Sequence, residues 1–139
     1  MPRFTLAQLQ QRASSHLPAH LRIRITHVAE GELHAEFDVR HELTAVNGYL
    51  HAGAVVSLAD TAAGFGCISH LPDGAENFTT IELKTNHVST AREGVVRCVA
   101  TLVHAGRSTQ VWDATVTHAE TAKVLAYYRC TQMILYPRA

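Results

Sequence analysis

The feature that most constrains the fold is the segment Gly53–Ser69, which carries a single charged residue. Its sequence, GAVVSLADTAAGFGCIS, is rich in Ala, Gly and Ser. A segment of this length and composition predicts a helix at about residues 53–69, and a helix that is apolar on all sides must be buried. Its small side chains allow neighbouring backbone to approach closely, so a sheet can wrap around it. Gly64 and Gly66 lower helix propensity and leave the end of the helix open.

Alternating apolar and polar residues predict strands on both sides of this helix. Leu21, Ile23 and Ile25 alternate with polar residues, and after the Glu30-Gly31 turn the segment 33–39 continues as a hairpin partner. Four further strands are separated by turn residues and lie at 78–88, 95–104, 109–117 and 124–135. The order predicts an α+β fold in which an antiparallel sheet of five to six strands, joined by sequential hairpins, curls around one central helix.

The chain of 139 residues fits a single domain, 1–139, without repeats or linkers. A short polar amphipathic helix is expected at about residues 5–15, ended by Pro18. The longest apolar run, Ala52–Ala59, is too short to span a bilayer, and the first residues have no apolar stretch typical of a signal peptide. Three cysteines without CxxC spacing favour a cytoplasmic protein with free thiols.

The charge balance argues against partners that bind through a strong electrostatic field. Lys plus Arg and Asp plus Glu number 12 each, so we expect neither nucleic-acid nor membrane binding. Ten histidines are present, but there is no HExxH motif, and Pro18 interrupts the His16/His20 pair. We therefore expect no metal site and no cofactor, and most histidines to be surface or sheet residues.

Asp60 is the residue that most needs an explanation, because it lies two turns into the apolar helix. A buried carboxylate without a partner costs several kcal/mol, so it needs a partner, a raised pKa or a role. A structural pairing with a buried arginine is one interpretation. The other is catalytic, because carboxylates in apolar clefts serve acyl-transfer enzymes as base or nucleophile.

The loop before the helix, Asn47-Gly48-Tyr49-Leu50-His51-Ala52-Gly53, leads into a helix N-terminus. Unpaired N–H groups and a partial positive charge at such an end suit an oxyanion or a polarised carbonyl. His51 either shapes this loop by hydrogen bonding or helps to position a substrate carbonyl.

Helix geometry then predicts a dimer. Ala52 and Asp60 are eight residues apart, so about 12 Å separates them along the helix. They cannot both act on one carbonyl carbon within one subunit. If both are catalytic, the helix N-terminus comes from one chain and Asp60 from another.

The run GYLHAGAVVSLADTA resembles the motif of hotdog-fold acyl-CoA thioesterases of the phenylacetate-pathway and hydroxybenzoyl-CoA type. The later stretches TTIELKTNHVSTAREG, HAGRSTQVWDATVT and TQMIL resemble the same family, so the resemblance covers about residues 33–135. It implies hydrolysis of an aryl- or medium-chain acyl-CoA to free acid and CoA. It also implies a homodimer that pairs into a tetramer, with CoA as part of the substrate rather than a cofactor.

Site residues follow from the resemblance position by position. Asp60 matches the catalytic acid, and the N–H that polarises the carbonyl falls on Ala52, with His51 and Gly53 beside it. Thr61 matches a hydroxyl position next to the acid, and Thr80 a strand hydroxyl that places the attacking water. The positions that contact CoA in relatives are occupied by His87, Ser89, Arg92, Arg107 and Ser108. The two arginines lie in successive turns and carry forked donors suited to phosphate.

Two positions depart from the family pattern. Ala52 replaces the first glycine of a pair, and Ala45 stands where many relatives have Asn or Gln. Asn47 is two positions away from Ala45. Either Asn47 substitutes for the missing side chain through a shifted loop, or the enzyme works without that side chain. Two alternatives therefore stay open: a hydratase or dehydratase on the same fold that pairs His51 with Asp60, and a non-catalytic acyl-CoA binding or dimerisation module.

Overall fold

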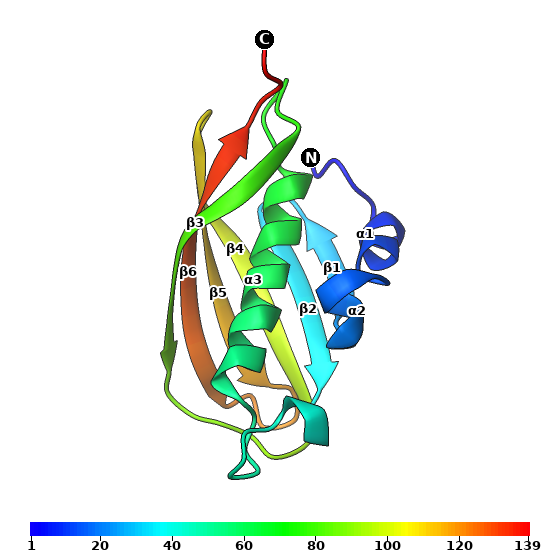
Figure 1. Cartoon of the computed structure of the whole chain (residues 1–139), viewed down its shortest axis with the longest axis vertical. Coiled ribbons are helices and arrows are strands. Elements are labelled where there is room, and N and C mark those ends of the chain that lie inside the picture. Colours follow the sequence, from blue (N-terminus) through cyan, green and yellow to red (C-terminus); the bar gives the residue numbers. More distant parts are fainter.

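The computed structural model describes all residues, 1–139, as one antiparallel sheet curved around a central helix (Figure 1). Helix α3 (Ala52–Ser69) lies against the concave face of the sheet and packs on strands β2, β4, β5 and β6. The six strands run in the order β1-β2-β4-β5-β6-β3. Their bounds are β1 Arg24–Ala29, β2 Glu32–Asp38, β3 Asn77–His87, β4 Val95–Ala105, β5 Thr109–His118 and β6 Val124–Leu135. The predicted hotdog arrangement is confirmed.

Helix α3 continues through Gly64 and Gly66, and the missing side chain of Gly66 leaves space for the ring of Trp112 in the core. A Cβ added to Gly66 would lie 2.7 Å from the ring of Trp112, which is fully buried. The cost in helix propensity is thus offset by close packing of helix on sheet. By length and hydropathy α3 could cross a membrane, yet half of it is buried inside this protein, which explains its apolar composition.

Hairpins connect β1 to β2, β4 to β5 and β5 to β6, as expected. The expected hairpin between β3 and β4 is wrong. Helix α3 carries the chain across the sheet to its far edge, where β3 pairs with β6, and β4 returns to pair with β2. The physical reason is that α3 lies across the concave face of β2, β4, β5 and β6, so the strand that follows it, β3, joins the sheet at the edge beyond them. Strand β3 is therefore an edge strand.

The N-terminal segment also differs from the prediction. Helix α1 (Leu6–Arg12) ends earlier, and a second short helix, α2 (His16–His20), includes Pro18. Pro18 is tolerated because it lies in the first turn of α2, where its missing N–H removes no intrahelical bond. Strand β1 begins only at Arg24, because Arg22 has a positive φ of 54° and turns the chain.

The loops gather at two ends of the sheet. The N-terminus of α3 lies at the end that also holds the loops from β3 to β4 and from β5 to β6 (Figure 1). There the short 3-10 helix η1 (His41–Leu43) precedes the loop into α3, and Leu50 N–H donates to Ala91 O at 2.8 Å. The C-terminus of α3 lies at the opposite end, with the β1–β2 and β4–β5 turns. All three cysteines are free and buried.

Candidate active site

The N-terminus of α3 leaves one backbone donor free. His51 is the N-cap, and its Nδ1 accepts a hydrogen bond of 2.7 Å from Gly53 N–H. The N–H groups of Ala54 and Val55 donate to His51 O at 3.0 and 3.2 Å. The N–H of exposed Ala52 has no acceptor in the chain. His51 therefore shapes the loop as the N-cap of α3. Because it accepts hydrogen bonds from the three N–H groups that follow that of Ala52, the Ala52 N–H is the donor left free.

Asn47 is engaged within its own loop. Its Oδ1 accepts a hydrogen bond of 3.1 Å from Tyr49 N–H, and Gly48 beside it has a φ of 85°, which only glycine adopts easily. Ala45 N–H closes the turn on Tyr49 O at 2.7 Å. The Asn47 side chain stabilises this turn through its oxygen, and its residue is exposed in the loop that leads into α3.

Asp60 is half-buried on the strip of α3 that the sheet leaves uncovered, next to half-buried Thr61. Its partner is a tyrosine and not an arginine: Tyr128 Oη donates a hydrogen bond of 2.8 Å to Asp60 Oδ1. Burial, above all, together with the neighbouring Cys130 and Asp60, raises the pKa of Tyr128 well above its usual value. The hydroxyl thus keeps its proton and acts as a permanent donor to the carboxylate.

Thr80 belongs to a separate hydrogen-bond network. Its Oγ1 donates to Gln132 Oε1 at 2.7 Å, and Gln132 is fully buried. Gln132 follows Tyr128 by four residues on β6, so about 13 Å of strand separates their backbones. A nearer hydroxyl is Thr85, which pairs with Tyr128 in register and whose buried Oγ1 has no hydrogen-bond partner.

The structure separates the predicted CoA contacts into two groups. His87, Ser89 and Arg92 lie at the end that holds the N-terminus of α3, and the Arg92 guanidinium stacks 4.2 Å above the Tyr49 ring. Arg107 and Ser108 lie in the turn after β4, a strand of 11 residues. About 36 Å of strand therefore separates the two groups within one chain. Arg92 and Arg107, although they lie in successive turns of the sequence, are therefore at opposite ends of the sheet.

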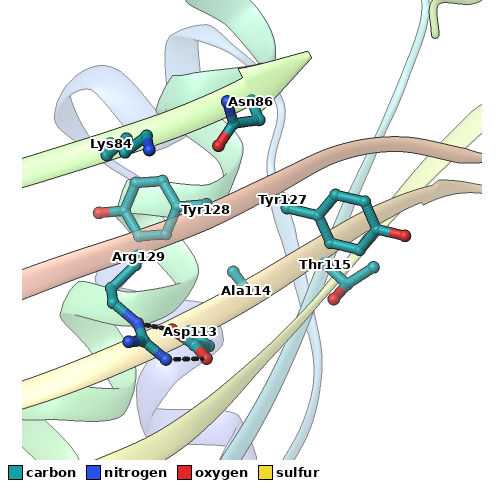
Figure 2. Close-up of a pocket in the computed structure, with 8 residues that line it drawn as sticks. All are labelled: Lys84, Asn86, Asp113, Ala114, Thr115, Tyr127, Tyr128 and Arg129. Atoms are coloured by element: carbon teal, nitrogen blue, oxygen red, sulfur yellow. Dashed lines mark hydrogen bonds and ion pairs between the residues drawn. The ribbon is translucent and has the colours of Figure 1, made fainter. Parts of the chain in front are cut away.

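A hollow of about 310 Å³ lies elsewhere, over β3, β5 and β6 (Figure 2). Figure 2 shows Asp113 and Arg129 paired there by two hydrogen bonds of 2.5 and 2.8 Å. Asp113 and Arg129 alternate along their strands with buried residues that face α3, so this hollow opens on the outer face of the sheet. It does not include Asp60 or Ala52.

Sequence reasoning missed Tyr128 and Thr85. Tyr128 lies in β6, whose alternation is clear, so its inward orientation was predictable in principle, whereas β3 is exposed over most of its length and shows no such alternation around Thr85. The contact of Tyr128 with Asp60 and the pairing of Thr85 with Tyr128 were not predictable, because each joins segments far apart in the chain. Trp112 is a core residue, and its Nε1–H donates a hydrogen bond of 2.8 Å to Gln110 Oε1.

Comparisons with known proteins agree with this architecture. Residues 47–125 match the thioesterase superfamily. A 1,4-dihydroxy-2-naphthoyl-CoA hydrolase of Listeria monocytogenes is 36% identical over 110 residues, which are 78% of this chain and 87% of that protein. An Escherichia coli protein of the same name is 32% identical over 136 residues, or 96% of each chain. The crystal structure of a Haemophilus influenzae thioesterase aligns with a TM-score of 0.89 at 30% identity, over 96% of this chain and 92% of that one.

The fold and these relatives together define a hotdog-fold thioester hydrolase. The chain belongs to the thioesterase superfamily, and its relatives support hydrolysis of acyl-CoA thioesters in general. They do not single out the phenylacetate-pathway type.

Proposed function

We propose that this protein hydrolyses an aryl- or medium-chain acyl-CoA with Asp60 as base or nucleophile. The observation that carries the proposal is that α3 holds both a free Ala52 N–H and a half-buried, tyrosine-bound Asp60. The eight residues between them correspond to about 12 Å. The two groups therefore complete one site only when a second chain supplies the other half.

The chemistry follows from the two groups. The thioester carbonyl oxygen accepts a hydrogen bond from Ala52 N–H at the positive end of the helix dipole. Asp60 of the partner either attacks the carbonyl carbon or takes a proton from the attacking water. The tetrahedral intermediate collapses, the C–S bond breaks, and CoA leaves as thiolate. If Asp60 attacks first, water then hydrolyses the acyl-enzyme anhydride.

Strand β3 supports the proposed dimer. It is an edge strand of 11 residues, so one row of its backbone N–H and C=O groups lacks a strand partner. Ile81 and Leu83 on β3 and Val88 just beyond it are large apolar residues left exposed. Pairing of β3 with β3 of a second copy satisfies the edge and covers these side chains. A tetramer formed from two such dimers remains part of the proposal, as implied by the family resemblance.

An aryl group is the substrate that we favour. Two relatives are named as hydrolases of 1,4-dihydroxy-2-naphthoyl-CoA. In this chain, half-buried Phe65 and Ile68 continue the uncovered strip of α3 beyond Asp60. They offer an apolar surface for a flat acyl group next to the carboxylate.

The proposed roles of the remaining residues depend on the same dimer. His87, Ser89 and Arg92 lie at the same end of the sheet as the N-terminus of α3, and Arg92 stacks on Tyr49 of the loop there; we propose that all three contact the CoA moiety. Arg107 and Ser108 lie at the other end of the sheet, so they serve the same CoA only if a neighbouring chain presents them. Thr61 beside Asp60 and the Asn47 amide are proposed to orient water and thioester.

A thiol-release assay tests the proposal with 1,4-dihydroxy-2-naphthoyl-CoA, benzoyl-CoA and octanoyl-CoA. We expect Asp60→Asn to lower turnover about 100-fold or more while CoA-thioester binding persists. Asp73→Asn, which changes an exposed acid in a loop, is the matched control and keeps full activity. Near-normal turnover in Asp60→Asn would refute the catalytic role. Conversion without thiol release would support a hydratase, and binding without conversion a non-catalytic module.

A further inference from the structure

Two histidines and a glutamate meet on the β1–β2 hairpin, on the face of the sheet turned away from α3. The ligand atoms of His27, Glu32 and His34 all lie within 4.8 Å of one another. His34 Nε2 lies 2.5 Å from Glu32 Oε1, and the two imidazole rings have centroids 4.8 Å apart. None of these residues takes part in the proposed hydrolysis.

Strand geometry explains the cluster. Glu32 and His34 are two residues apart on β2, so they share a face of the sheet. His27 on β1 is the register partner of His34, although an ideal ladder continuing from the Ile25–Ala35 pair would place Thr26 there. A β-bulge between Ile25 and His27 absorbs Thr26, and both Thr26 and His27 are exposed. The bulge therefore brings His27 opposite His34.

The charges on this face set Glu32 apart. Four polar residues of β2 share the face, and three of them are acidic: Glu32, Glu36 and Asp38. Glu36 is paired with Arg24 and Arg97, and Asp38 with Arg24. Glu32 makes no ion pair with Lys or Arg, and its one ion-pair partner is His34. Its carboxylate is thus the one acid of β2 on this face without a permanent cation.

We propose that His27, Glu32 and His34 form a binding site for a divalent transition-metal ion of the Zn²⁺ class. Two imidazoles and a carboxylate are ligands that suit Zn²⁺, Ni²⁺ or Cu²⁺ and disfavour Mg²⁺ and Ca²⁺. Tetrahedral Zn²⁺ with bonds of about 2.0–2.1 Å holds its ligand atoms roughly 3.4 Å apart. The present spacing, at most 4.8 Å, exceeds that value by no more than about 1.4 Å. The fourth position faces solvent and is open to water or an exogenous ligand.

The site is independent of thioester hydrolysis because the sheet lies between it and α3. The expected effect of the ion is structural, because it links β1 to β2 and so stabilises the hairpin at this edge of the sheet. Binding to the folded chain alone stabilises it by mass action, so the melting temperature rises with metal concentration.

The test is Zn²⁺ titration by calorimetry of the untagged, metal-stripped protein, with melting curves at each ratio. We expect one site in the wild type, affinity lowered roughly tenfold or more by His27→Gln or His34→Gln, and loss of the Zn²⁺-dependent rise in melting temperature. His104→Gln, which removes an exposed histidine on β4, is the matched control and leaves Zn²⁺ affinity unchanged. Mg²⁺ is expected to give no heat and no shift.

Glu32→Gln separates the ligands further, because it keeps the size of the side chain and removes the charge; weaker Zn²⁺ binding supports the three-ligand site. Equal Zn²⁺ affinity in the wild type and in both histidine variants would overturn the proposal, as would an equal loss in His104→Gln, which indicates binding spread over surface histidines. Thiol release by the same variants is expected to be unchanged. Failure of the metal site and failure of the hydrolase proposal are therefore distinguishable.

Discussion

The hydroxyl of Tyr128 on β6 donates a hydrogen bond of 2.8 Å to Oδ1 of Asp60 on α3. This contact joins residues that lie 68 positions apart in the chain. It is found in place of the arginine pairing that the sequence left open, and it holds the Asp60 carboxyl group without a cationic partner. A tyrosine whose pKa is raised mainly by burial remains a donor throughout the physiological pH range. Tyr128 is therefore a positioning residue for the proposed base or nucleophile.

Tyr128→Phe is expected to lower kcat with little change in KM. A hydrogen bond to a charged group is worth about 1.5–3 kcal/mol, which corresponds to roughly a tenfold to hundredfold loss if it holds Asp60 in its reactive orientation. Tyr127→Phe is the control, because Tyr127 is the adjacent residue, is 52% exposed and lies on the other face of the sheet. Steady-state kinetics on folded variants checks this. A Tyr128→Phe variant that is less stable but has normal kcat would show a merely structural role.

Complementation between inactive variants tests whether two chains share each site. Ala52→Pro removes the free N–H at the first helical position, where proline is well tolerated, and the extended His51 backbone (ψ 135°) accommodates a following proline. Mixing Ala52→Pro with Asp60→Asn subunits gives heterodimers with one intact site. Random pairing then restores about a quarter of wild-type activity in a two-fold dimer.

The control mixture contains Asp60→Asn and the Ala52→Pro/Asp60→Asn double variant, in which no intact site can form. It is expected to stay inactive at every ratio. If the first mixture is as inactive as its components, the two groups do not act across the interface.

Ile81→Lys is expected to convert dimers into folded, inactive monomers. A lysine on an edge strand opposes pairing with a second strand. Leu17→Lys is the matched control, because Leu17 on α2 is 55% exposed and Ile81 is 53% exposed. Light scattering after size-exclusion chromatography measures the mass of each. A dimeric Ile81→Lys variant, or a monomeric wild type, would contradict pairing through β3.

Gly66→Ala is expected to destabilise the fold although alanine favours helix. The new Cβ would lie 2.7 Å from the Trp112 ring, and overpacking of this kind costs about 1–3 kcal/mol, more than the roughly 1 kcal/mol gained in propensity. Gly64→Ala is the control: its nearest contact, 3.1 Å, is the far end of half-buried Phe78, which can shift. Urea unfolding compares the two. Equal stabilities would argue against the packing of Trp112 on Gly66.

Much of the fold was predictable because it depends on local pattern. The apolar segment that begins near Gly53 can be stable only when covered, and the alternation along β2, β4, β5 and β6 specifies which residues face it. The end of α3 and the position of β3 were not predictable in this way. The cost of Gly66 in helix propensity is offset by the packing of Trp112 beside it, and β3 pairs with β6 because α3 crosses the sheet.

From the sequence alone follow a buried helix bearing one acid, a helix N-terminus about eight residues before that acid, and strands that can wrap around the helix, since each depends on side chains close together in the chain. Tertiary structure decided which donor is free at Ala52, which hydroxyl binds Asp60, and which histidine faces His34. These depend on strand pairing, on a β-bulge and on contacts between distant segments. Short-range periodicity contains no information about them.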